Sequence, residues 1–358
     1  MAISAKTLEK VKWVCMERWY TGLFGMGGLS IGVDLGSQLN KFVVLKQKGD
    51  HYILKDWGIE PVTSPLHSEA FPTAQTSSYR LTTWLKKGLQ ASSLGISVSG
   101  PRVIVKRLEF PSITEEDIRE HLRWELDRYI SLEMGEVLWD IHVPPSSSFD
   151  TSQSIQVLLV GAQKEWLESI ISHFKEWKIS FVDVDAFALT NLITEIYGPE
   201  KPCLLAHIGP SGMLLLVMHH GEVVLYREVP FAEEWYGDLV DQIRVTQVSS
   251  LSEKPMEVSA QMLWEPFLEE VTGHIRSILS ECSATGSSPA IGDVVLSGGY
   301  AVIEGMAMGF SQRLGLPVKV VDPFQMIEVP AFFRQDSDFL AAVPLLGVAA
   351  GVAIRGNT

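Results

Sequence analysis

The chain has 358 residues, of which 46% are apolar and 20% charged, a composition typical of a globular protein with room for two domains. The formal net charge is −14 and no basic block offsets it, so binding to nucleic acid is not expected. The three cysteines, Cys15, Cys203 and Cys282, are far apart in sequence and form no metal-binding pair, which favours a reducing compartment.

No stretch of the sequence reaches the roughly 20 apolar residues that a membrane-spanning helix needs. The most apolar segment, residues 339–354, contains Pro344, Gly347 and Gly351 and predicts a buried helix instead. Charged side chains occupy the N-terminal positions where a signal peptide has an apolar core. We therefore expect a cytoplasmic protein with no transmembrane segment.

Residues 1–28 are predicted to form an N-terminal extension. Leu8, Val11, Cys15 and Trp19 recur at helical spacing, and a glycine-rich segment follows them. This pattern predicts a short amphipathic helix, which either packs on the body of the protein or contacts a membrane surface or a partner.

Residues 29–93 predict the opening of a first α/β lobe. Apolar runs rich in β-forming residues predict three strands, at residues 29–34, 41–47 and 52–59. The first two strands are joined by a glycine turn. A polar loop is expected at residues 61–78, and a helix at residues 79–89.

Residues 94–180 predict an inserted α+β subdomain. Thr114 is placed to cap a helix, with Asp117 three residues later and apolar residues at helical spacing after it. Trp124 lies off the apolar stripe of this helix, and it is either packed elsewhere or a contact for a partner. We expect one or two strands at residues 96–108, further strands at residues 137–143 and 155–162, and helices at residues 114–130 and 164–178.

Residues 181–356 predict a second lobe, which opens with a strand and a helix at residues 181–185 and 186–197. Strands separated by glycine turns, at residues 203–207, 213–218 and 222–229, then repeat the pattern of the first lobe. Further helices are expected at residues 262–281 and 301–314, and strands at residues 293–297 and 318–321. A helix at residues 339–356 is assigned to the first lobe. The alternation of strands and helices around two similar hairpins favours two related α/β lobes that face each other.

Glycine turns in both lobes have residues suited to phosphate. Asp34 precedes Gly36 and Ser37, so a carboxylate can reach Mg²⁺ while backbone N–H groups face phosphate oxygens. A second turn spans residues 209–212, and a strand at residues 294–297 runs into a third glycine turn. Each turn alone is explained as well by an ordinary tight turn.

The order and spacing of the three turns resemble the actin superfamily, whose fold is ribonuclease H-like. Within it, the chain resembles the type IV pilus assembly protein PilM family, which is related to FtsA. The similar segments are the opening hairpin at residues 31–37 with Lys41, the helix and strand at residues 123–130 and 136–140, and the strand and helix at residues 182–189. The C-terminal segments at residues 297–301, 316–324 and 347–355 are also similar, so the resemblance covers about residues 29–356.

The resemblance implies a two-lobed actin-like fold with an SHS2-like inserted subdomain, and ATP and Mg²⁺ between the lobes. Asp34 is the implied metal ligand. The implied cofactor-binding residues are Asp34, Gly36, Ser37, Lys41, Gly209, Ser211, Gly298 and Gly299. No catalytic residue is assigned.

The second phosphate turn departs from the family pattern. His207 stands where the family has aspartate, Met213 where it has threonine, and residues 231–234 where it has two glycines. Neutral histidine cannot take the magnesium-binding role of a carboxylate, and methionine donates no hydrogen bond. The departures predict an ATP-binding protein with weak or no ATPase activity.

The resemblance also implies a partner and a location. In the PilM family, the cytoplasmic N-terminal tail of a PilN-like inner-membrane protein recruits the protein to the membrane. Here we expect the tail to dock beside residues 96–108 and 114–130, adding main-chain hydrogen bonds to a strand edge. The type II secretion platform and an FtsA-like filament remain alternatives, and self-association stays open.

Overall fold

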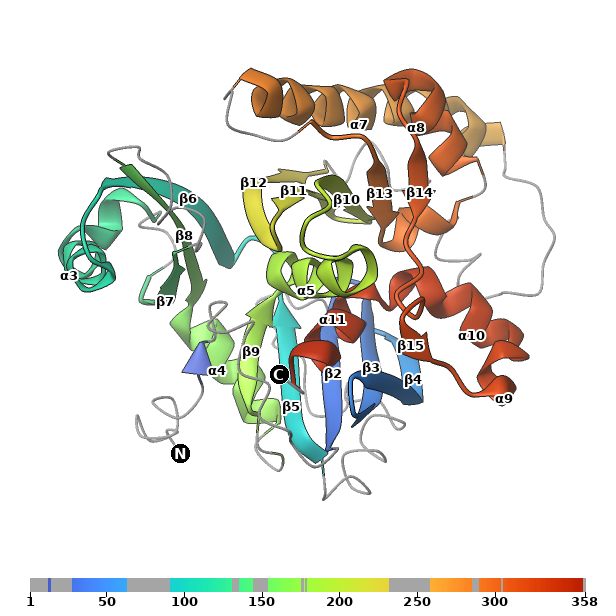
Figure 1. Cartoon of the computed structure of the whole chain (residues 1–358), viewed down its shortest axis with the longest axis horizontal. Coiled ribbons are helices and arrows are strands. Elements are labelled where there is room, and N and C mark those ends of the chain that lie inside the picture. The colour runs from blue at the N-terminus through green and yellow to red at the C-terminus, as the bar shows by residue number, and fades with distance from the viewer. Residues whose placement is uncertain are drawn as a thin grey trace.

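The computed structural model describes residues 12–13, 28–62, 91–130, 135–143, 154–174, 177, 179–231, 258–284, 290–303 and 305–356. These residues form two large sheets and one small sheet, with helices packed on and between them (Figure 1). The predicted two-lobed α/β fold of the actin-like kind is confirmed.

The first sheet has the strand order β1-β9-β5-β2-β3-β4-β15. Its centre is an antiparallel meander of β2, β3 and β4, and the remaining strands pair in parallel. In that order the strands are Lys12–Trp13, Phe181–Val184, Ala91–Val98, Leu29–Leu35, Leu39–Lys48, His51–Pro61 and Ile327–Glu328.

The second sheet has the order β12-β11-β10-β13-β14 and repeats this plan, with an antiparallel meander followed by parallel strands. Helices α7 (Val258–Ala284) and α8 (Met306–Leu314) cover its outer face, where Phe267 and Phe310 are fully buried. In sheet order, its strands are Glu222–Pro230, Gly212–His219, Cys203–Gly209, Val294–Ser297 and Val318–Val320.

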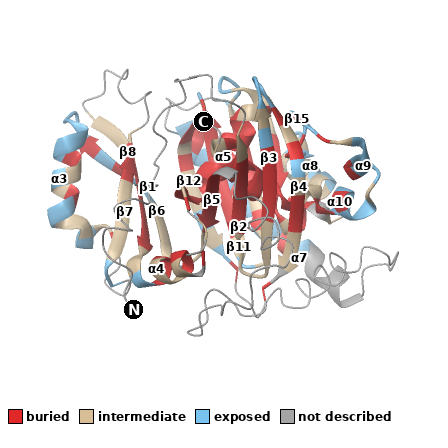
Figure 2. Ribbon diagram, turned by 90° about the horizontal axis from the view of Figure 1, so that it is seen from below, coloured by how far each residue is buried: buried red, intermediate tan, exposed pale blue. Residues whose placement is uncertain are grey.

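Two helices occupy the space between the large sheets. Helices α5 (Asp185–Tyr197) and α11 (Gly347–Arg355) are buried on nearly all sides, as Figure 2 shows for α5. One apolar core joins α5 to the first sheet and to residues of the second, such as Leu205 and Leu216. A helix that is apolar all round belongs in such an interior position.

The inserted subdomain is a three-stranded sheet, in the order β6 (Val103–Pro111), β8 (Ser154–Gln163) and β7 (Val137–His142). One face packs on α3 (Glu115–Glu125), and α4 (Lys164–His173) joins the main core with the other face. That the subdomain is SHS2-like stays a prediction.

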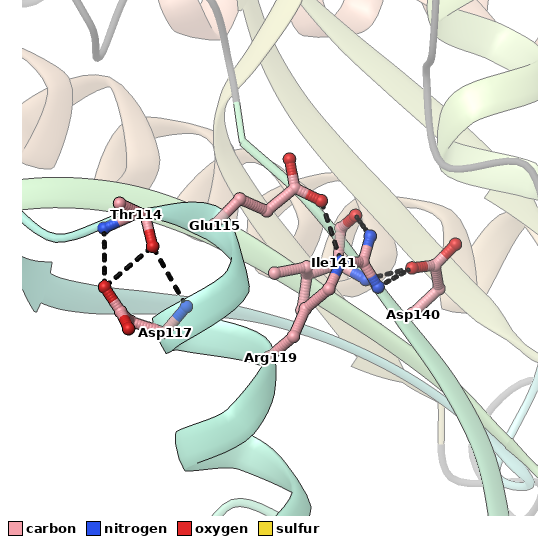
Figure 3. Close-up of polar contacts among 6 residues, drawn as sticks. All are labelled: Thr114, Glu115, Asp117, Arg119, Asp140 and Ile141. Atoms are coloured by element: carbon pink, nitrogen blue, oxygen red, sulfur yellow. Dashed lines mark hydrogen bonds and ion pairs between the residues drawn. The ribbon is translucent and has the colours of Figure 1, made fainter.

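Polar contacts fix α3 to this small sheet, as Figure 3 shows. The predicted cap is confirmed, because Thr114 Oγ1 accepts from the Asp117 N–H at 3.2 Å and the Thr114 N–H donates back to the Asp117 carboxylate. Arg119 donates to Asp140 Oδ1 on β7 at 2.6 Å and to the Ile141 carbonyl at 3.4 Å. The helix and strand therefore form one unit.

Strand pairing corrects both boundaries that the sequence predicted for the inserted subdomain. Residues 94–98, assigned to the subdomain, lie in β5, which pairs with β2 and β9 in the first sheet. Residues 181–184, assigned to the second lobe, are β9 of the same sheet. The strands themselves were predicted correctly, but periodicity does not show which sheet a strand joins.

Other local predictions were only partly right. Residues 12–13, predicted as helix, pair with β9 as a short strand that covers its edge. The helix predicted at residues 164–178 ends at His173, and a 3₁₀ turn (Gly299–Val302) precedes α8. The C-terminal segment splits into α10 (Ser337–Ala342), a 3₁₀ turn with Pro344, and α11.

The loop and helix predicted for residues 61–89 lie, apart from residues 61 and 62, outside the described residues.

In the described part of the chain, no single helix is long and apolar enough to cross a membrane. One pair of helical segments, Ser337–Leu345 and Gly347–Arg355, meets the test by length and composition but is bent by 76°.

Glycine allows α11 to lie directly on α5. A Cβ at Gly351 would overlap the backbone carbonyl of Ala188, whereas a Cβ at Gly273 in α7 would meet nothing within 4 Å. We predict that Gly351→Ala lowers the free energy of unfolding by about 1–3 kcal/mol through overpacking. The same change at Gly273 should raise it by about 0.5–1 kcal/mol, because alanine favours helix. Urea denaturation of both variants measures the two changes in the free energy of unfolding. Equal changes in the two variants would contradict the close packing of α11.

Candidate functional site

The two phosphate turns of the lobes face each other. Ser37, in the turn between β2 and β3, donates its hydroxyl to Ser211 Oγ at 3.4 Å, and Ser211 lies in the turn between β10 and β11. The two residues are 174 positions apart in sequence. The structure thus brings Ser37, Ser211 and the adjacent Gly36 and Gly209 together, although their role in binding stays a prediction.

Asp34 and Lys41 form an ion pair beneath the first turn. They are cross-strand partners on β2 and β3, and Lys41 Nζ lies 2.7 Å from Asp34 Oδ2. Burial raises the pKa of Asp34, while Lys41 opposes the rise. A Cβ at Gly36 would come within 2.6 Å of the Leu39 carbonyl and 3.0 Å of Lys41 Nζ, so glycine is what allows this compact turn.

Sequence analysis did not select a second carboxylate, Asp185, as a site residue. Asp185 begins α5 and accepts a hydrogen bond from Ser97 Oγ at 2.7 Å. Its negative charge raises the pKa of Asp34, and burial raises the pKa of Asp185 itself. The available signal was its position directly after a buried strand, since the carboxyl ends of parallel strands meet at one edge of a sheet.

His207 lies on the facing lobe. On β10, its Nδ1 lies 3.2 Å from Ser297 Oγ, the register partner on β13. Burial lowers the pKa of His207 to about 4, and the charges of Asp34 and Lys41 also act on the ring. The imidazole is therefore neutral at pH 7. Met213 is buried among the apolar residues of the second lobe, and it contributes no polar group.

Gly298 and Gly299 begin the third turn directly after Ser297. Gly298 has a φ of +91°, and a Cβ there would lie 2.5 Å from the carbonyl of Ile208, the neighbour of His207. Only glycine fits this backbone conformation and this close approach. The third turn is thus held against the strand that leads to the second turn.

Comparison with known proteins identifies the family. The model of a family described as type IV pilus assembly protein PilM matches residues 32–357. The chain belongs to the PilM family. The protein therefore takes part in type IV pilus assembly, and the match decides for that process over type II secretion and an FtsA-like filament.

Solved structures share the fold. A structure described as a PilM–PilN type IV pilus biogenesis complex has a TM-score of 0.73 and 20% identity, covering 92% of this chain and 98% of that one. The ethanolamine utilization protein EutJ from Carboxydothermus hydrogenoformans has a TM-score of 0.49 and 13% identity, covering 91% and 89%. These likenesses concern the fold alone.

Two buried carboxylates, Asp34 and Asp185, lie near the glycine turns of this PilM-family protein. No group of three or more His, Cys, Asp or Glu side chains able to hold a metal occurs among the residues the structure describes. Magnesium, however, often takes only one or two carboxylates and completes its shell with phosphate oxygens and water. That Asp34 and Asp185 form such a pair is a prediction.

A titration of His207 tests the geometry of the cleft. We predict that its ring resonances stay in the neutral position at pH 7 and titrate near pH 4. Because the folded pKa lies below the value of about 6.5 in the unfolded chain, this group stabilises the fold above that pH and loses the effect as the pH falls toward 4. Proton–nitrogen NMR of labelled histidine measures both the resonances at pH 7 and the midpoint of the titration. Titration of His207 near pH 6.5 would place it in water, outside the cleft.

Proposed function

We propose that this PilM-family protein is an ATP-binding scaffold on the cytoplasmic side of the type IV pilus inner-membrane platform. It holds ATP and Mg²⁺ between its lobes, hydrolyses ATP weakly or not at all, and recruits the N-terminal tail of a PilN-like membrane protein. The observation that supports the nucleotide part is the contact between Ser37 and Ser211, which brings the glycine turns of the two lobes together.

Different residues would bind different parts of the nucleotide and its metal. Backbone N–H groups at Gly36, Ser37, Gly209 and Ser211 would face phosphate oxygens. Lys41 would add a positive charge. Asp34 and Asp185 would hold the metal or its water shell. The third turn, with Gly298 and Gly299, suits the close approach of a base or phosphate.

The residues of the second lobe are the reason to expect weak hydrolysis of ATP. A histidine with a pKa of about 4 is a poor base at pH 7, and it brings no negative charge to position a metal-bound water. Met213 points into the apolar core and cannot replace the missing hydroxyl donor. The second lobe retains its glycine turn, which would bind phosphate oxygens.

Calorimetric titration with ATP and Mg²⁺ tests the nucleotide site. We predict measurable binding by the wild-type protein and at least about a tenfold loss in Asp34→Ala, because a metal ligand is removed. Asp50→Ala serves as the matched control, since Asp50 is an exposed carboxylate of the same lobe. Equal affinities in all three proteins would refute the assignment of Asp34, and no binding by the wild type would refute the nucleotide site.

For the partner, the structure narrows the docking face that the sequence predicted. Residues 96–98 lie in β5, inside the first sheet between β9 and β2, so they offer no free edge. Residues 103–108 belong to β6, an edge strand of the small sheet among the described strands. Trp124 on α3 is 82% exposed. An edge strand and an exposed tryptophan on one subdomain suit an extended peptide with an apolar side chain.

A fluorescently labelled peptide from the tail of the neighbouring PilN-like protein tests this docking face. We predict that Trp124→Ala weakens binding roughly 30-fold, as loss of about 2 kcal/mol at an aromatic anchor would. Phe332→Ala is the matched control, because Phe332 is an aromatic residue 64% exposed on another part of the molecule. Anisotropy titrations measure both. Equal loss in the two variants, or no loss in either, would refute the docking role of α3.

A further inference from the structure

The inserted subdomain meets the rest of the protein at a small joint formed by residues of four elements, β6, β7, β12 and α5. His142 at the end of β7 and Glu222 at the start of β12 form a pair 2.7 Å apart, and both side chains are less than 10% exposed. Arg107 on β6 donates to the Val224 carbonyl of β12 at 2.7 Å. The His142 ring also meets Phe187 of α5 edge-on, with centroids 6.2 Å apart.

The joint acts on the whole small sheet. Arg107 and His142 are both register partners of Leu158 on the central strand β8, so the three residues form one row across the sheet. Arg107 also donates to Gln156 of β8 at 2.8 Å. A displacement of β12 would therefore reach all three strands at once.

The two elements on the far side of the joint also contribute Asp185 and a residue near it. Helix α5 contributes Phe187 to the joint and, two residues earlier, Asp185 to the cleft. Strand β12 contributes Glu222 to the joint and, four residues later, Tyr226, whose hydroxyl donates to Glu228. The pKa of Tyr226 is raised by burial and by the charges of Glu228 and Asp185, so this part of β12 lies near the cleft carboxylate.

The pair at the joint resists separation. Removing one partner of a buried pair leaves the other as an uncompensated polar or charged group, which is strongly unfavourable. When β12 moves, His142 and Glu222 are therefore expected to move together rather than slide apart. Energetic coupling between sites is carried by packed, hydrogen-bonded elements of this kind.

We propose that the joint transmits occupancy of the cleft to the inserted subdomain, with His142 and Glu222 as its positioning residues. The inference rests on the proposed nucleotide site. Nucleotide would fix the turns of the two lobes relative to Asp185, β12 would follow, and the joint would set the orientation and order of β7 and α3, the face proposed for the partner.

Hydrogen exchange of the full chain, with and without ATP and Mg²⁺, tests the proposal. In the wild type we expect nucleotide to slow exchange in the β2–β3 hairpin and also in β7 and α3, there by about fivefold or more, the lower end of ordinary coupling between sites. In His142→Ala, the slowing should persist in the hairpin and be lost in β7 and α3. Arg107→Ala is a milder change, because Arg107 is more exposed than His142. It should weaken the slowing of exchange in β7 and α3 without affecting the hairpin.

The matched control is Asp140→Ala, which removes the ion pair with Arg119 inside the subdomain and leaves the joint intact. In Asp140→Ala, nucleotide should still slow hydrogen exchange in β7 and α3. Slowing that persists in both His142→Ala and Arg107→Ala, or that Asp140→Ala also abolishes, would overturn the proposal. Slowing confined to the hairpin of the wild type would overturn the joint but leave the nucleotide site standing. No slowing anywhere would overturn both.

Discussion

The close packing of α11 against β2 and α5 is the constraint on which the cleft depends. Gly32 on β2 has no room for a Cβ beside the α11 backbone, and Gly351 has none beside α5. Ser30 donates its hydroxyl to the Ala353 carbonyl at 2.6 Å. Because α11 touches both elements at backbone distance, it fixes the strand that carries Asp34 relative to the helix that begins with Asp185.

A buried ion pair locks the same helix to the sheet. Arg355 at the end of α11 lies 3.1 Å from Asp183 on β9, whose side chain is fully buried. Burial raises the pKa of Asp183, and Arg355 and the Val184 N–H oppose the rise. Such a pair adds little net stability but favours one arrangement, since any other leaves a buried charge unpaired. The first sheet, α5 and α11 therefore form one packed unit.

Local sequence patterns predicted most of the elements and the phosphate turns, because strands, caps and glycine turns depend on neighbouring residues. The capped helix at Thr114 and the hairpins of both lobes are examples. The sheet to which β5 and β9 belong could not be predicted, since long-range pairing decides it. For the same reason Asp185 was missed, and so was the pair of His142 and Glu222, which are 80 positions apart.

The chemistry of the cleft indicates how this protein uses its fold. A kinase or ATPase of this architecture needs polar groups from both lobes to position the water or acceptor, but here the second lobe offers a neutral His207 and an apolar Met213. The first lobe keeps its carboxylates and lysine, and both lobes keep their glycine turns. Groups that bind in the ground state are thus preserved while groups that act only in the transition state are missing. Under the proposed function, binding energy in such a site would hold the lobes together, which is the work of a scaffold.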